Sequence, residues 1–329
     1  MLRRSISRFL LLAIASLPFA AGSAHAQDQA EGYPDRVVTL VVPFPAGGSS
    51  DTMARLVAQE LSKSLGQQFI VDNKPGANGN IGSAQVARAE PDGYTLLLSG
   101  VGSNAINYTL YPKLGYDPKD LAHVTLFATG PNVLVANLEF EAKTFKEFIE
   151  LAKARPGEFN YASSGNGSSG HLAMEMLKQA AGIDLQHVPY KGGAPAMTDV
   201  MGGQVPVMFI NQDAVLPHVK AGKMVALAVA SLERNPAYPD TPTIAESGYP
   251  GFAAQSWFGL SAPAAVPRPI TDKLNAATIK ALHAPEIQER LESNGFVVVG
   301  STPEEYAAWI EAETAKWAKV IEASGAEIE

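Results

Sequence analysis

Short apolar runs rich in β-branched residues alternate along this chain with longer amphipathic stretches, and the connections between them are brief. The run at 37–42 (VVTLVV) is continuously apolar, which is typical of a strand buried on both faces of a sheet. A helical pattern follows at 51–65, and the same succession recurs along the chain. This alternation predicts an α/β fold with largely parallel sheets. In such sheets, ligands bind beyond the carboxyl ends of the strands, where helix N-termini point.

The spacing of apolar residues, which differs between helices and strands, locates the individual helices and strands. The helix that begins after Thr144 has a capping box, because Glu147 stands three residues beyond this Thr N-cap. We expect strands at 37–42, 69–72, 94–99, 124–128, 132–136, 160–163, 186–190, 205–210 and 225–230. We expect helices at 51–65, 80–89, 144–154, 168–181, 194–201, 214–221, 269–283 and 303–324.

Composition excludes several classes of function. The 329 residues include no cysteine, which excludes zinc ribbons, disulfide scaffolds and a cysteine nucleophile. The chain has 25 Lys+Arg against 33 Asp+Glu and no basic block, so nucleic acid is not an expected partner. The length predicts about two domains of roughly 150 residues.

The first 26 residues have the pattern of a secretory signal peptide. Three arginines precede an apolar run at 9–21, and Ala24 and Ala26 form an A-x-A-like cleavage site. The run is shorter than the roughly 20 residues that span a bilayer, although an uncleaved anchor helix is the alternative. We expect cleavage after about Ala26 and a mature chain that begins near Gln27, free in the periplasm. That chain has 22 Lys+Arg and 33 Asp+Glu, a formal charge of −11.

The first candidate site is the loop that follows the first strand. Gly47 and Gly48 allow backbone N–H groups to approach a ligand closely. The helix N-terminus that follows presents unpaired N–H groups and a partial positive charge, which favour an anion. Ser49, Ser50 or Asp51 can cap this helix. A plain strand-to-helix turn capped by Asp51 is the alternative interpretation.

A second loop of the same kind lies at 161–171. Gly165, Gly167 and Gly170 fit the G-x-G-x-x-G pattern of dinucleotide-binding proteins. Lys191, however, stands at the end of the next strand, where that pattern needs an acid. No G-x-S-x-G nucleophile motif is present in the loop. The remaining interpretation is an anion cradle of hydroxyl and amide groups, and the two loops together indicate an anion bound from both sides.

Four further features each have two interpretations. His171 and Glu175 lie four residues apart and fit either a metal pair or a histidine that hydrogen-bonds the preceding loop. Lys191 either adds positive charge to the site or is solvated. The segment 211–213 follows an apolar strand and either contacts a ligand or caps the next helix. The aromatic residues at 257–258 are expected in core or hinge packing rather than stacked on a ligand.

These motifs together resemble the Bug-type periplasmic solute-binding receptors of tripartite tricarboxylate transporters. The resemblance covers essentially the whole mature chain. The segments that carry it are Tyr33-Pro34, Val42–Asp51, Asp72–Gly82, Pro91–Leu96, Tyr161–His171, Val188–Gly192, Pro217-His218, Ala221–Lys223 and Tyr238–Thr243.

The resemblance implies a two-domain periplasmic-binding-protein fold of the Venus-flytrap kind, type II-like, with two chain crossovers. Domain 1 is expected at 27–128 plus 250–329, and domain 2 at 129–249. The implied function is a monomeric receptor rather than an enzyme, with no cofactor and no bound metal. It captures a small di-, tri- or aromatic carboxylic acid in an interdomain cleft and delivers it to the transporter's membrane subunits. An exported enzyme on the same fold and a receptor for a sensor kinase are the alternatives.

In this family a carboxylate is held largely through backbone amides and ordered waters. Many members carry an Asp-Asn pair directly after the phenylalanine that corresponds to Phe209, and here Ile210 replaces the Asp. Loss of that acid favours a ligand without an ammonium group, although Asp213 can restore an acid nearby. The candidate ligand-binding residues are Phe44, Ala46, Gly47, Gly48, Asp51, Ala77, Ser163, Ser164, Asn166, Gly167, Ser168, His171, Tyr190, Asn211 and Asp213.

Overall fold

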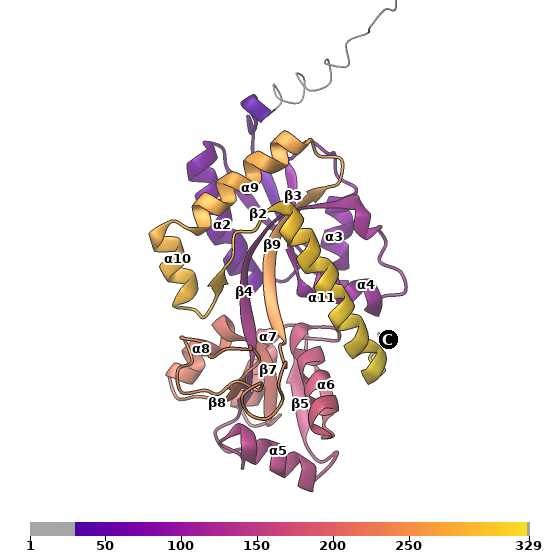
Figure 1. The fold of residues 1–329 in the computed structure, drawn as a ribbon, viewed down its shortest axis with the longest axis vertical. Coiled ribbons are helices and arrows are strands. Elements are labelled where there is room, and N and C mark those ends of the chain that lie inside the picture. Colours follow the sequence, from indigo (N-terminus) through magenta and orange to yellow (C-terminus); the bar gives the residue numbers. More distant parts are fainter. Residues whose placement is uncertain (1–29, 328–329) are drawn as a thin grey trace, which may run out of the picture.

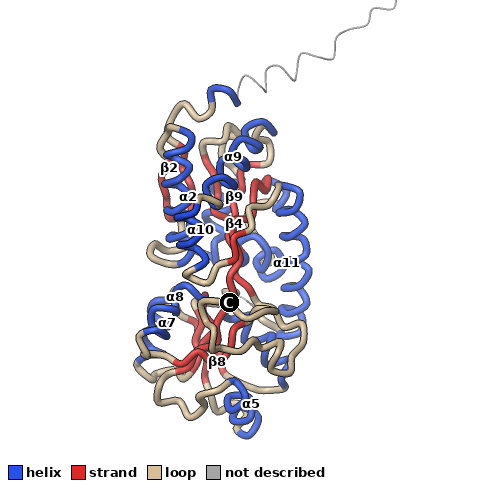
Figure 2. The backbone as a smooth tube through the Cα atoms, turned by 60° about the vertical axis from the view of Figure 1, so that its left-hand side comes forward, coloured by secondary structure: helices blue, strands red, loops and turns tan. Residues whose placement is uncertain are grey.

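The computed structural model describes residues 30–327 and forms two lobes joined by two long strands (Figure 1). The expected signal peptide (1–26) and the mature start near Gln27 lie outside the described residues. Across 30–327, no helix combines the length and the apolar character that a membrane crossing needs. Figure 2 shows the strands continuing from one lobe to the other, with helices packed around them.

The first lobe contains a mixed sheet in the order β2-β1-β3-β9-β4. The strand β1 pairs in parallel with β2 and β3, whereas β9 is antiparallel to β3 and β4. The strands are β1 (Val38–Val42), β2 (Phe69–Asn73), β3 (Thr95–Gly100), β9 (Gln255–Pro263), β4 (Leu121–Ala136) and β10 (Val297–Val298), which pairs with β4. The helices are α2 (Ser49–Leu65), α3 (Asn80–Ala87), α4 (Asn107–Leu110), α9 (Arg268–Leu282) and α10 (Pro285–Glu292).

The second lobe contains a sheet in the order β4-β7-β5-β6, with β8 on the other side of β4. The strand β5 pairs in parallel with both β6 and β7. The strands are β5 (Asn160–Ser163), β6 (Gln186–Pro189), β7 (Val207–Asn211) and β8 (Val225–Val229). The helices are α5 (Phe145–Ala154), α6 (Ser169–Ala181), α7 (Gly193–Met201) and α8 (Gln212–Lys220). The predicted capping box of α5 is confirmed, since Thr144 and Glu147 make both of its hydrogen bonds.

The strand β4 corrects two predictions. It is a single strand of 16 residues, where the sequence predicts separate strands at 124–128 and 132–136. It pairs with β9 as far as Pro131 and with β7 from Asn132 onward, so one strand belongs to both sheets. The prediction of largely parallel sheets is also wrong, because β4 and β9 pair antiparallel with their neighbours and make both sheets mixed.

A long C-terminal helix, α11 (Pro303–Ser324), runs along one side of both lobes (Figure 1). It packs against η2 (Gly102–Ile106) of the first lobe and α6 of the second. The carboxylate of Glu313, buried on this helix, accepts hydrogen bonds from the indole N–H groups of Trp257 (3.1 Å) and Trp317 (3.0 Å). Because Trp257 lies on β9, these contacts join α11 to a strand that links the lobes. The prediction that Trp257 serves core or hinge packing is confirmed.

Strand direction determines which loops meet between the lobes. The strand β4 enters the second lobe and runs in the same direction as β1 and β3, because β9 is antiparallel to both β3 and β4. The strands β5, β6 and β7 run in the opposite direction, since β7 is antiparallel to β4. The carboxyl ends of the parallel strands of each lobe therefore point toward the other lobe.

Candidate functional site

Two hydrogen bonds join the facing loops of the two lobes. The hydroxyl of Ser49, at the start of α2, donates to Oδ1 of Asp213 on α8 at 2.8 Å. The side-chain amide of Asn78 donates to the backbone oxygen of Gly167 at 2.9 Å. The partners are 164 and 89 residues apart in the sequence. The first predicted loop thus contacts the start of α8, and the second predicted loop contacts the glycine-rich loop after β2.

The N-terminus of α2 is open at this junction between the lobes. Its N-cap, Gly48, makes no side-chain capping bond, so the N–H groups of the first turn remain available to an anion. Asp51 is buried and does not cap the helix. Its Oδ2 accepts the N–H of Gly47 (3.0 Å) and the Nε of Arg55 (3.0 Å). The amide of Gly47 is therefore already bonded, and the available amides begin at Gly48.

The glycine-rich loop after β2 contributes a residue that the sequence did not single out. Ala77 and Asn78 both have φ of 48°, in the left-handed region. Asn78 also donates to Oδ1 of Asn107 (2.8 Å), and Asn107 donates back to the Asn78 backbone oxygen (3.0 Å). Both side-chain amide protons of Asn78 are thus bonded, one of them to Gly167 of the other lobe. An asparagine directly before a glycine is the sequence signal, because asparagine tolerates the left-handed region.

The loop after β5 is ordered by its own hydrogen bonds. The hydroxyl oxygen of Ser163 accepts the N–H of Gly165 at 3.1 Å. Ser168 is the N-cap of α6, and its hydroxyl oxygen accepts the N–H of His171 at 3.3 Å. The N–H of Gly167 donates to Nδ1 of His171 at 3.1 Å. The prediction of a first-turn histidine that hydrogen-bonds the preceding loop is confirmed.

The alternative pairing of His171 with Glu175 as metal ligands is not supported. One oxygen of the Glu175 carboxylate accepts the hydroxyl of Tyr161 (2.6 Å) and the ammonium of Lys178 (2.9 Å). Among residues 30–327, no group of three or more potential metal ligands is present. Glu175 therefore has a structural contact in place of a metal.

The segment after β7 supplies the acid at the junction. Burial raises the pKa of Asp213 to about 6, although the Ser49 hydroxyl and the first amides of α8 oppose that rise. Asn211, the N-cap of α8, uses its Oδ1 to accept the Ser256 hydroxyl of β9 (2.7 Å) instead of capping the helix. A Cβ on Gly130 would lie 2.3 Å from Nε2 of the buried Gln212. Packing of this amide explains why position 130 of β4 has no side chain.

Tyr190 directly follows β6 of the second lobe, and its hydroxyl contacts α7. Its hydroxyl donates to Oδ2 of Asp199 on α7 at 2.7 Å. Burial and the Asp199 carboxylate raise the pKa of this hydroxyl to about 12. The helix α7 has an uncapped N-terminus at Gly192, so this part of the second lobe presents backbone amides as well. The ligand contacts of all the predicted residues stay a prediction: Phe44, Ala46, Gly47, Gly48, Asp51, Ala77, Ser163, Ser164, Asn166, Gly167, Ser168, His171, Tyr190, Asn211 and Asp213.

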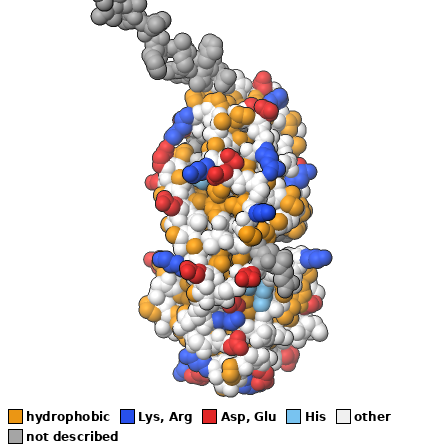
Figure 3. All heavy atoms as spheres, turned by 90° about the vertical axis from the view of Figure 1, so that its right-hand side faces the viewer, with side chains coloured by type: hydrophobic (Ala, Val, Ile, Leu, Met, Phe, Trp, Pro, Cys, Tyr) orange, Lys and Arg blue, Asp and Glu red, His pale blue; other side chains and the backbone are white. Residues whose placement is uncertain are grey.

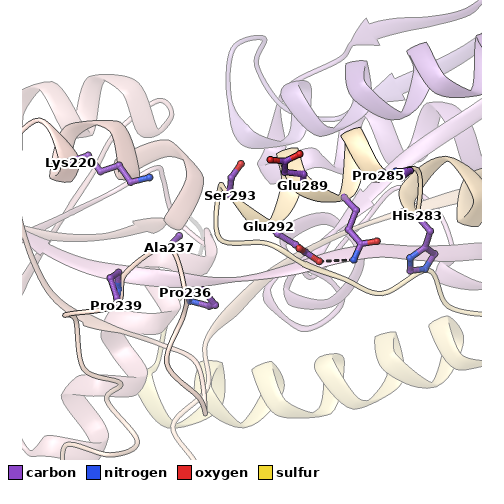
Figure 4. A pocket seen from close by; sticks show the side chains of 10 residues that line it. Lys220, Pro236, Ala237, Pro239, His283, Pro285, Glu289, Glu292 and Ser293 are labelled. Carbon is purple, nitrogen blue, oxygen red and sulfur yellow. Dashed lines mark hydrogen bonds between the residues drawn. The ribbon is translucent and has the colours of Figure 1, made fainter.

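A groove of about 770 Å³ lies elsewhere, between α10 and the C-terminal end of α8 (Figure 4). Its polar lining includes Glu289 and Glu292, and Gln288 donates to Glu292 at 2.7 Å. Two carboxylates disfavour an anionic ligand there. Lys220 and Pro285, at the uncapped N-terminus of α10, also line the groove, so the two carboxylates are the feature that counts against an anion there.

The arrangement defines a class of protein. Two α/β lobes are joined by crossing strands, and uncapped helix N-termini face the junction, as in bilobal solute-binding proteins. The face drawn in Figure 3 narrows at a waist between the lobes, and its charged side chains of both signs are interspersed.

The chain belongs to the tripartite tricarboxylate transporter receptor family, whose model matches residues 53–326. It is 38% identical to protein BugT of Bordetella pertussis over 97% of this chain and 98% of that protein. The solved structure of Rpa4515 from R. palustris with adipate has a TM-score of 0.86 and 38% identity, and covers 90% of this chain and 100% of its own. MatC from Rhodopseudomonas palustris with bound malate has a TM-score of 0.81 and 36% identity, and covers 88% and 100%.

These findings confirm the resemblance, the two-domain periplasmic-binding-protein fold and the role of a solute-binding receptor. The family is periplasmic and belongs to a transport system.

Proposed function

We propose that this receptor binds a small non-amino dicarboxylate between its lobes and delivers it to the membrane subunits of a tripartite tricarboxylate transporter. The observation that carries the proposal is the uncapped N-terminus of α2 at the interlobe junction, where Ser49 contacts Asp213 of the other lobe. Amides at such a terminus bind a carboxylate without a cationic side chain. Bound adipate and malate in two relatives support a diacid.

Two side chains of the second lobe, Ile210 and Asp213, favour a ligand without an ammonium group. Ile210 is buried and packs within the apolar core of the second lobe, where many relatives are expected to place an acid. Asp213 is an acid at the junction, but its Oδ1 already accepts the Ser49 hydroxyl. A ligand ammonium would therefore meet a carboxylate that already has hydrogen-bond partners, Ser49 and the first amides of α8.

We further propose that the protein is a monomer without enzymatic activity and that its signal peptide is removed after about Ala26. The domains would be 27–128 plus 250–329 and 129–249. The change of partner of β4 at Pro131 and Asn132 supports a first crossing close to that boundary.

The test is a thermal-shift screen of mono-, di-, tri- and aromatic carboxylates, followed by calorimetry on each acid that stabilises the protein. Adipate and malate are the first probes. We expect at least one diacid to bind and to be recovered chemically unchanged. Turnover of the acid would overturn the receptor assignment in favour of an enzyme. Tight binding of glutamate or aspartate without binding of any simple diacid would overturn the ligand class.

Gly48→Val tests where the carboxylate binds. Gly48 has φ of −89°, and a Cβ there would lie 3.8 Å from its nearest neighbour, so valine fits the fold but screens the helix amides. Loss of a hydrogen bond to a charged ligand is worth about 1.5–3 kcal/mol, which predicts roughly ten- to a hundredfold weaker binding. Gly32→Val is the matched control, since no atom lies within 4 Å of its Cβ position. Equal affinity of the two variants would place the carboxylate elsewhere.

A further inference from the structure

Three aromatic rings are stacked next to the loop at 163–168. The imidazoles of His171 and His187 lie 4.0 Å apart between centroids, with an interplanar angle of 10°. The ring of Tyr161 continues the stack at 4.9 Å from His187, with an angle of 21°. The rings come from α6, β6 and β5, so three elements of the second lobe converge on this point.

Each imidazole holds one position of the loop. Nδ1 of His171 accepts the N–H of Gly167, which requires this nitrogen to be unprotonated. Nε2 of His187 lies 2.6 Å from the hydroxyl of Ser163, which also accepts the N–H of Gly165. The loop is thus supported at both ends of its glycine segment by side chains outside that segment.

The groups around the stack keep both rings neutral. Burial is the main cause that lowers the pKa of His171 to about 4 and that of His187 to about 3. Lys178, whose ammonium lies 5.9 Å from the Tyr161 ring, disfavours a second positive charge, whereas Glu175 acts in the opposite direction on His187. If Nδ1 of His171 were protonated, its N–H would point at the N–H of Gly167, and the hydrogen bond between them would be lost.

We propose that His171 and His187 are a pair of positioning residues that hold the ligand-binding loop in place, and that His171 does so only while its Nδ1 carries no proton. Gly167 connects the histidines to the binding site, because its backbone oxygen also accepts the interlobe hydrogen bond from Asn78. The position of this one glycine therefore depends on His171 on one side and on Asn78 of the opposite lobe on the other. The inference deepens the proposed function and rests on it.

The test uses asparagine and glutamine in a crossed design. An asparagine amide oxygen can reach about where Nδ1 of histidine lies, and a glutamine amide oxygen can reach about where Nε2 lies. For His171, which uses Nδ1, His171→Asn should retain affinity within about threefold, whereas His171→Gln should weaken binding roughly three- to tenfold. For His187, which uses Nε2, the order is reversed: His187→Gln is retained and His187→Asn is weakened.

Calorimetry with the diacid identified in the carboxylate screen provides the readout at pH 7.5, and circular dichroism verifies that each variant is folded. A role in packing alone predicts the same loss for Asn and Gln at each position, so equal affinities within each pair would overturn the proposal. If no carboxylate binds the unaltered protein, the proposed function fails instead. The two failures are therefore distinguishable.

Nitrogen chemical shifts of the imidazoles provide a second readout that needs no ligand. Both rings should remain neutral at pH 5.5, where an ordinary imidazole with a pKa near 6.5 is mostly protonated. His171 should show an unprotonated Nδ1 and a protonated Nε2. A protonated Nδ1 on His171 at that pH would overturn the proposal.

Discussion

One substitution, at Glu313, tests the hydrogen bonds that join α11 to β9, one of the two strands that link the lobes. One oxygen of its buried carboxylate accepts two indole N–H groups, from Trp257 and Trp317, and both rings are fully buried. Lys316 pairs with the other oxygen. Glu313→Ala removes the acceptor of both indoles.

The magnitude follows from the number of donors left without a partner. A buried donor without an acceptor costs about 1–3 kcal/mol, so two indoles cost roughly 2–6 kcal/mol. The better helix propensity of alanine returns only a few tenths of a kcal/mol. We expect Glu313→Ala to lower the free energy of unfolding by about 4 kcal/mol, well outside the range of an exposed substitution.

The assay is urea unfolding followed by tryptophan fluorescence and circular dichroism. The matched control is Glu311→Ala, which removes an exposed acid from the same helix. The control should change the free energy of unfolding by less than about 0.5 kcal/mol. If Glu313→Ala lies within about 1 kcal/mol of the control, the two indole bonds do not contribute as argued.

Three further predictions concern the junction and the second lobe. Ser49→Ala removes the contact to Asp213, so the ligand-free protein should be more open, with a larger radius of gyration in small-angle scattering; an unchanged radius would contradict this. Gly170→Ala should destabilise the fold by about 1–3 kcal/mol in urea unfolding, because its Cβ would lie 2.3 Å from the Phe209 backbone oxygen. The unfolded chain takes up protons near pH 6.5 and folded His171 only near pH 4, so stability is lost as the pH falls through this range. His171→Asn should therefore gain about 3 kcal/mol relative to the unaltered protein between pH 7 and pH 4, and parallel pH profiles would refute this.

The local elements could be predicted from the sequence because their signals are local. The continuous apolar run before Pro43 indicates β1, and the Thr144–Glu147 box indicates the start of α5. The predicted break between 124–128 and 132–136 fails because a strand flanked by β9, β7 and β8 tolerates the missing N–H of Pro131. The strand β9 was not predicted, since its pairing partners lie far away in the sequence.

The candidate site also has parts that could be predicted from the sequence and parts that could not. Both glycine-rich loops could be recognised, because small residues between a strand and a helix are a local pattern. The contacts with the opposite lobe could not, since Asn78 reaches Gly167 of the second loop across 89 residues and no local pattern encodes that approach. His187 was missed for a similar reason: it lies within a strand, and only the fold brings its ring beside His171.

The position of α11 has a consequence for the order in which the protein folds. Trp317, Val320 and Ile321 belong to an apolar cluster that also contains residues of η2 and α6, so the last helix of the chain completes a core shared by both lobes. A ribosome-bound chain without this helix exposes that cluster and lacks an acceptor for the Trp257 indole. Completion of the core must therefore wait until residues 303–324 have been synthesised. For a member of a periplasmic family, this delay lengthens the time in which the chain is still unfolded and can be translocated.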